Sequence, residues 1–87
     1  MHYLLFTTGA CSRCPEAKEI MKNQQLFKGE IVDCSEDGRG TTLANAYNIV
    51  TVPTVVIIDD RNGKTVRTWN GPEQIRAGLS DYEKNSY

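Results

Sequence analysis

The chain has 87 residues and a formal net charge of −1, so it is long enough for one small domain and has no charge excess that favours nucleic acid or an anionic membrane. Its apolar runs are far shorter than the ~20 residues of a transmembrane helix. Three cysteines are an odd number, which argues against a purely structural disulfide framework. We therefore expect one domain over residues 1–87 and neither a nucleic-acid nor a membrane partner. With no secretory signal visible, we also expect a cytoplasmic location.

The first part of the chain predicts a strand, a helix and a second strand. The apolar run from His2 to Thr7 is strand-like, and residues 8–10 are small enough for a turn. Apolar residues then recur at helical spacing from Ser12 to about Gln25. Pro15 fits only the first turn of that helix, where a missing N–H costs little. Residues 30–33 predict the second strand.

The middle of the chain predicts a short helix and a hairpin. Residues 37–40 are loop-like, and the threonines at 41–42 can cap a helix that runs to about Tyr47. Consecutive β-branched apolar residues over 54–58 predict a third strand that is buried on both faces. A turn at 60–63 then leads to a fourth strand over 64–69, antiparallel to the third.

The end of the chain predicts a last helix that begins at residues 71–73. Ile75, Leu79 and Tyr82 lie on one side of it at i, i+4 and i+7. We expect residues 85–87 to be frayed. The complete order of elements is βαβαββα, and the chain shows no repeat, linker or low-complexity segment.

The segment Cys11-Ser12-Arg13-Cys14 is the candidate reaction centre, because it opens the first predicted helix. Free N–H groups and the positive end of the helix dipole stabilise a thiolate there. Cys11 is therefore the expected nucleophile, with a pKa below the value of about 8.5 of a free thiol. Cys14, one turn on, should be the more buried cysteine. The alternatives are two inert thiols or half of a zinc site completed by Cys34 and His2, neither of which has metal-ligand spacing.

Other residues near this segment have both a functional and an ordinary interpretation. The Arg13 guanidinium can favour the Cys11 thiolate, or it can be a solubilising side chain. Lys18, at i+4 from Cys14, has the same two interpretations, with the solubilising one preferred. Cys34 is interpreted as a structural thiol, and His2 as a surface residue. Trp69 is expected to pack in the core rather than to contact a partner.

Two segments carry a family resemblance. The sequence Cys11-Ser-Arg-Cys14-Pro15-Glu-Ala17-Lys18 resembles the CxxCPxAK opening of short redoxins, and Tyr47-Asn-Ile49-Val-Thr-Val52-Pro53-Thr54 is similar to the Y-x-I-x-x-V-P-T segment of thioredoxins. Together they resemble the thioredoxin/glutaredoxin superfamily. This resemblance implies an α/β fold of the minimal βαβαββα thioredoxin type, with a four-stranded mixed sheet in the order 2-1-3-4. It also implies a cis Val52–Pro53 bond that faces the cysteines.

The sequence departs from the family patterns at two places that matter for chemistry. Thioredoxins bury an aspartate beneath the cysteines, about where Leu5 stands, so the base that deprotonates Cys14 is unidentified. Glutaredoxins carry Gly-Gly and an acidic residue at the start of the last helix for glutathione, and Asn70-Gly71-Pro72-Glu73 preserves this only partly. The stretch Trp69-Asn70-Gly71 is similar to the Trp-Ser-Gly of small redoxins that reduce ribonucleotide reductase.

The resemblance implies a thiol–disulfide oxidoreductase that reduces protein disulfides through the Cys11/Cys14 dithiol. Val52 and Pro53 would bind the substrate beside the cysteines, and Arg13 is a further candidate for substrate binding. A reductase or a low-molecular-weight thiol would restore the dithiol. No metal or organic cofactor is implied, and we expect a monomer. The alternatives are a glutaredoxin that uses glutathione, a small electron donor to ribonucleotide reductase and a non-enzymatic metal-binding CxxC module.

Overall fold

Seven elements follow one another in the predicted order βαβαββα. The computed structural model describes residues 1–35 and 38–84. The predictions for residue 37 and for residues 85–87 lie outside the described residues. The elements are β1 (His2–Thr7), α1 (Cys14–Asn23), β2 (Lys28–Asp33), α2 (Arg39–Ala46), β3 (Thr54–Ile58), β4 (Thr65–Asn70) and α3 (Gly71–Lys84).

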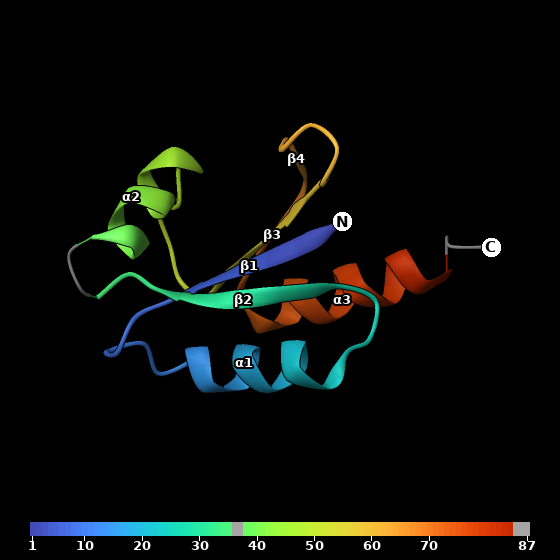
Figure 1. Ribbon diagram of the computed structural model, residues 1–87. Coiled ribbons are helices and arrows are strands. Elements are labelled where there is room, and N and C mark those ends of the chain that lie inside the picture. Colours follow the sequence, from blue (N-terminus) through green and yellow to red (C-terminus); the bar gives the residue numbers. More distant parts are fainter. Residues whose placement is uncertain (36–37, 85–87) are drawn as a thin grey trace.

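The four strands form one mixed sheet in the order β2-β1-β3-β4, which confirms the predicted order. β1 is parallel to β2 and antiparallel to β3, and β3 is antiparallel to β4. Helices α1 and α3 cover one face of the sheet and α2 lies over the other (Figure 1). No helix within the described part of the chain is long and apolar enough to cross a membrane.

The apolar core has two parts, one on each face of the sheet. Every residue of β3 is buried, as predicted, and its side chains alternate between the two parts. Val55 and Ile57 pack with residues of α1 and α3, whereas Val56 and Ile58 pack on the side of α2. The α1–α3 side also holds Leu5, Ala17, Met21, Trp69, Ile75 and Leu79.

The two helices in the first half of the chain begin at other residues than the sequence predicts. Helix α1 begins at Cys14 rather than Ser12, and Arg13 precedes it without a side-chain cap. Helix α2 begins at Arg39 rather than Thr41, after Gly38 with a φ of 116°. Gly40 lies so close to the Asp33 carbonyl that a Cβ there would overlap it. Tertiary contact with the end of β2 therefore positions this helix start, not a threonine cap.

Two strands are also shifted from their predicted bounds. β2 begins at Lys28 rather than at residue 30, because it pairs with β1 from His2 onward. β4 covers Thr65–Asn70 rather than 64–69, because the carbonyl of Lys64 accepts the Asp59 N–H at 2.9 Å and closes the turn. The predicted hairpin between β3 and β4 is confirmed.

The strand register brings the two recognised sequence segments to one end of the sheet. Phe6 near the end of β1 pairs with Thr54 at the start of β3. The loop with the cysteines leaves β1 at this end, and Val52-Pro53 enters β3 at the same end. Helix α3 also begins there, directly after β4, at Gly71 with a φ of 84°.

Candidate functional site

Cys11 and Cys14 form a disulfide, with their Cα atoms 5.4 Å apart. Cys14 is the first residue of α1 and is only 1% exposed, whereas Cys11 is partly exposed. The Cys11 N–H donates to the Thr8 carbonyl at 3.3 Å, which closes the turn that follows β1. The structure thus has the predicted contrast in burial, with one partly exposed cysteine and one buried cysteine.

Helix α1 begins later relative to the two cysteines than the sequence predicts. Because α1 begins at Cys14, Cys11 precedes the first turn rather than lying within it. Pro15 occupies the first turn, as predicted. The unpaired N–H groups of this turn and the helix dipole therefore act at the cysteine loop.

The segment before β3 is tied to the start of α3. The Val52–Pro53 bond is cis, and Pro53 is buried. The Pro53 carbonyl accepts the Gly71 N–H at 2.9 Å. The Thr54 hydroxyl donates to the Thr51 carbonyl at 2.7 Å and lies 2.9 Å from Asn70 Oδ1. Val52 is half-buried beside this proline and packs against the core on the side of α2.

Arg13 is paired with a carboxylate from the other end of the chain. Its Nη2 atom forms an ion pair with Glu73 in the first turn of α3, and the two side chains are 54% and 75% exposed. The backbone N–H of Glu73 itself, followed by Arg13, lowers the pKa of the Glu73 carboxyl group. A second pair, Arg76 with Glu16 at 3.4 Å, also joins α3 to α1. The sequence analysis noted Glu73 only as part of a partly preserved glutathione pattern; its contact with Arg13 was not predicted, because 60 residues separate the partners and no local pattern links them.

Leu5, Cys34 and His2 lie in environments that give them no part in the cysteine site. Leu5 is fully buried in the apolar core, so this position supplies no carboxylate beneath the cysteines. Burial raises the pKa of the Cys34 thiol, and the nearby Asp33 carboxylate raises it further. Cys34 is the free cysteine, and it packs at the border of the core on the side of α2. His2 pairs with Asp60 at the opposite end of β1 from the cysteines.

Two further observations bear on the alternatives. In residues 1–35 and 38–84, no three or more His, Cys, Asp or Glu side chains are grouped closely enough to hold a metal ion. Trp69 is buried, and its indole lies against Gly78 of α3 so closely that a Cβ there would overlap it. Trp69 is therefore a packing residue, as the sequence analysis preferred.

Solved structures with a similar fold are thioredoxins. Thioredoxin 1 of Thermosipho africanus matches with a TM-score of 0.71 and 24% identity, covering 97% of this chain and 92% of that one. Thioredoxin from Trypanosoma brucei brucei matches with a TM-score of 0.72 and 21% identity, covering 97% and 75%. Thioredoxin O2 of Arabidopsis thaliana matches with a TM-score of 0.70 and 21% identity, covering 99% and 75%. The chain thus has the thioredoxin fold. No curated protein sequence matches it.

The sequence itself matches the glutaredoxin family model over residues 4–61, which include both cysteines and Pro53. The chain belongs to the glutaredoxin family. With this family, this fold and a CxxC pair that forms a disulfide, it is a thiol–disulfide oxidoreductase. Its substrates are in general protein disulfides, and its cycle needs a reductant.

Proposed function

We propose that Cys11 is the nucleophile that reduces disulfides in protein substrates. The Cys11 thiolate attacks one sulfur of the substrate disulfide. A bond forms between Cys11 Sγ and that sulfur, the substrate S–S bond breaks, and the released thiolate takes up a proton. The observation that carries this assignment is the difference in burial within the bonded pair, because Cys11 is partly exposed to a large substrate whereas Cys14 is buried.

Cys14 then resolves the mixed disulfide. Its thiolate attacks Cys11 Sγ, the Cys11–Cys14 bond forms, and the second substrate thiolate leaves and is protonated. Two electrons and two protons pass from the dithiol to the substrate in one cycle. Leu5 beneath the pair cannot accept the Cys14 proton, so solvent or the leaving thiolate takes it.

Val52, Pro53 and Arg13 are proposed to contact the substrate. The hydrogen bond from Gly71 to Pro53 and the contacts of Thr54 support this proposal, because they hold the proline segment at the end of the sheet where the cysteine loop leaves β1. Arg13 is held by Glu73, and a guanidinium has five N–H donors, so it retains donors for a substrate carbonyl or carboxylate.

The reductant that restores the dithiol is proposed to be a reductase or a low-molecular-weight thiol other than glutathione. The family match is the observation that favours glutathione. Against it, the acidic residue at the start of α3, Glu73, is already paired with Arg13. Glutathione would have to compete with this ion pair for the carboxylate.

A cytoplasmic location and an electron-transport role are proposed as well. An unpaired third cysteine and a reversible CxxC pair suit a reducing compartment. Ribonucleotide reductase is a weaker candidate partner. Trp69 is buried, so that of the three residues similar to the Trp-Ser-Gly segment mainly Asn70 and Gly71 can contact a partner.

The direct test is the reduction of insulin disulfides with dithiothreitol as the electron source. We expect catalysis by the wild-type protein and none by Cys11→Ser. The same purified protein is analysed for bound metal, and a Cys11→Ser/Cys14→Ser variant shows whether any metal depends on the pair. Stoichiometric zinc that depends on Cys11 and Cys14, without insulin reduction, would replace the redox assignment with a metal-binding one.

A further inference from the structure

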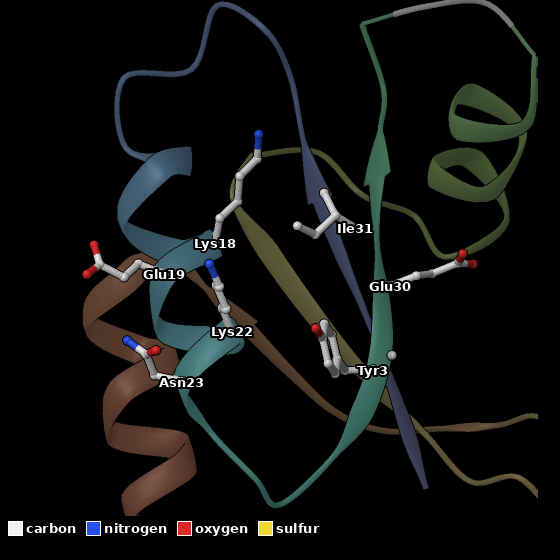
Figure 2. Close-up of a pocket in the computed structure, with 8 residues that line it drawn as sticks. Tyr3, Lys18, Glu19, Lys22, Asn23, Glu30 and Ile31 are labelled. Carbon is white, nitrogen blue, oxygen red and sulfur yellow. The ribbon is translucent and has the colours of Figure 1, made fainter.

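A groove lies between helix α1 and the outer strand β2, away from the cysteines at the start of α1. Its volume is about 600 Å³, and it is lined by residues that include Tyr3, Lys18, Lys22 and Ile31. In Figure 2, Lys18 extends away from α1, Lys22 lies along the helix, and the Tyr3 ring lies between the helix and β2. Gly29 of β2 makes room for this ring, since a Cβ there would overlap it.

The charge in this groove is positive. Neither Lys18 nor Lys22 forms an ion pair within 4.0 Å with a carboxylate in the described residues. The two glutamates of the lining point away from the groove in Figure 2: Glu19 lies on the far side of α1, and Glu30 points toward α2, where it pairs with Arg39. Asp33, at the end of β2, is hydrogen-bonded by Ser35, and Lys18 acts on it only from a distance.

The Tyr3 side chain adds no negative charge to this groove. Burial raises the pKa of the Tyr3 phenol, so it remains neutral at physiological pH. A protein with a net charge of −1 thus presents two neighbouring cations that have no carboxylate partner within 4.0 Å among residues 1–35 and 38–84. Lys18 and Lys22 therefore favour the binding of an anionic ligand.

The strand beside the lysines can pair with another chain. β2 is an outer strand of the sheet, and no described strand pairs with its free edge. Such an edge presents backbone N–H and C=O groups that can accept an extended peptide as a further strand. Ile31, which is 47% exposed, adds an apolar contact at this edge. A small inorganic anion would satisfy the lysines but would leave both the strand edge and Ile31 unused.

The spacing of the lysines fits such a strand. Four residues of a helix rise by about 6 Å. Two residues of a strand rise by about 6.6 Å and place both side chains on the same face. Because α1 runs alongside β2 (Figure 1), acidic residues at positions i and i+2 of an added strand match Lys18 and Lys22.

We propose that the β2 edge and the α1 groove bind an extended peptide segment of a partner protein that carries acidic residues at i and i+2. The peptide backbone pairs with β2. Its acidic side chains meet Lys18 and Lys22, and an apolar side chain contacts Ile31. This docking site is separate from the disulfide chemistry of Cys11 and Cys14.

The probe for this site is a fluorescein-labelled decapeptide centred on Glu-Val-Glu, with threonine and serine at the other positions. Fluorescence anisotropy at low salt measures its affinity for the full chain. We expect Lys18→Gln/Lys22→Gln to weaken binding at least about tenfold, since a charge-assisted contact is typically worth more than a neutral one. The matched control is Lys64→Gln/Arg67→Gln, which removes the same charge at the β3–β4 hairpin and should change binding less than about twofold.

Two further peptides test the geometry. A peptide with Glu-Val-Val-Glu places the acids on opposite faces of the strand, so that only one of them faces the lysines. It should bind more weakly than the Glu-Val-Glu peptide and more tightly than one with Gln-Val-Gln. Amide NMR shifts should change along residues 28–32. N-methylation of the alternate peptide residues whose N–H groups face β2 should abolish binding, because it removes the donors of the strand pairing.

Three results would overturn the proposal. The first is an equal loss of affinity in the groove variant and the hairpin control, which would indicate only a long-range charge effect. The second is an equal response of the same amides to inorganic phosphate, which would indicate a small-anion site. The third is self-association that buries residues 28–32, seen by sedimentation and by NMR, which would identify a second copy of the chain as the occupant.

Discussion

The two faces of the sheet are supported very differently. On one face, α1 and α3 bury a ten-residue apolar cluster with β1, β3 and β4. On the other face, five buried residues are covered mainly by α2, which has no fully buried residue of its own. Cys14 begins a helix on the well-packed face, whereas Cys34 lies on the thinner face beside a cavity of about 230 Å³. The cysteine at the start of α1 is therefore buried, whereas Cys34 is only partly buried against the smaller cluster.

The largest expected effect is the loss of activity on replacing Cys11, compared with the replacement of Cys34 on the other face. Cys11→Ser should reduce the rate of insulin reduction to that of dithiothreitol alone, because no other accessible thiol belongs to a CxxC pair. Cys34→Ser, its matched control, should keep the wild-type rate. A strong loss of rate in Cys34→Ser would place the third cysteine in the catalytic cycle.

Two neighbouring leucines of β1 allow the packing on the two faces of the sheet to be compared. Leu5 is fully buried on the side of α1 and α3, whereas Leu4 faces the side of α2. Leu5→Ala should lower the free energy of unfolding by about 4 kcal/mol and Leu4→Ala by about 2–3 kcal/mol, because a thin cover relaxes into the cavity more easily. Urea denaturation followed by circular dichroism provides the comparison. Equal losses would show that the two faces are equally rigid.

The pH dependence of alkylation compares the thiols chemically. Burial raises the pKa of Cys34, so its thiolate is scarce near neutral pH and its reaction with iodoacetamide should accelerate only in alkaline solution. In the reduced protein, Cys11 should react fastest and at lower pH, because the helix N-terminus favours its thiolate. Peptide mapping after timed alkylation measures both rates. Faster reaction of Cys34 at neutral pH would reverse this assignment.

The smallest expected effect concerns the Arg13–Glu73 pair. Arg13→Gln should slow alkylation of Cys11, because it removes a cation from the cysteine loop. Glu73→Gln should accelerate it slightly, because the guanidinium is then no longer neutralised by its partner. Both changes should stay below about fivefold in physiological salt, since exposed charges are screened. Glu16→Gln, which breaks the neighbouring pair with Arg76, serves as the control.

The sequence was most informative where local rules determine the structure. The β-branched run at 54–58 predicted a doubly buried strand, and β3 is buried throughout. The spacing of Cys11 and Cys14 predicted a pair that can form a disulfide, and the two sulfurs are bonded. Pro15 correctly indicated the first turn of α1.

Tertiary contacts determined what the sequence could not predict. Helix α2 begins where Gly40 approaches the end of β2, which no local pattern shows. Glu73 joined the site through an ion pair with a residue 60 positions away. The position of Lys18 and Lys22 beside β2 could also not be predicted from the sequence, because it depends on how α1 packs on the sheet.

The most direct test of the central assignment is to trap the first covalent intermediate. A Cys14→Ser variant, reduced and mixed with insulin, cannot resolve the mixed disulfide and should accumulate it. Intact mass followed by peptide mapping identifies the bonded cysteine. We predict that insulin is attached to Cys11 and that dithiothreitol releases it. Attachment through Cys34, or no adduct at all, would contradict the assignment of Cys11 as the nucleophile.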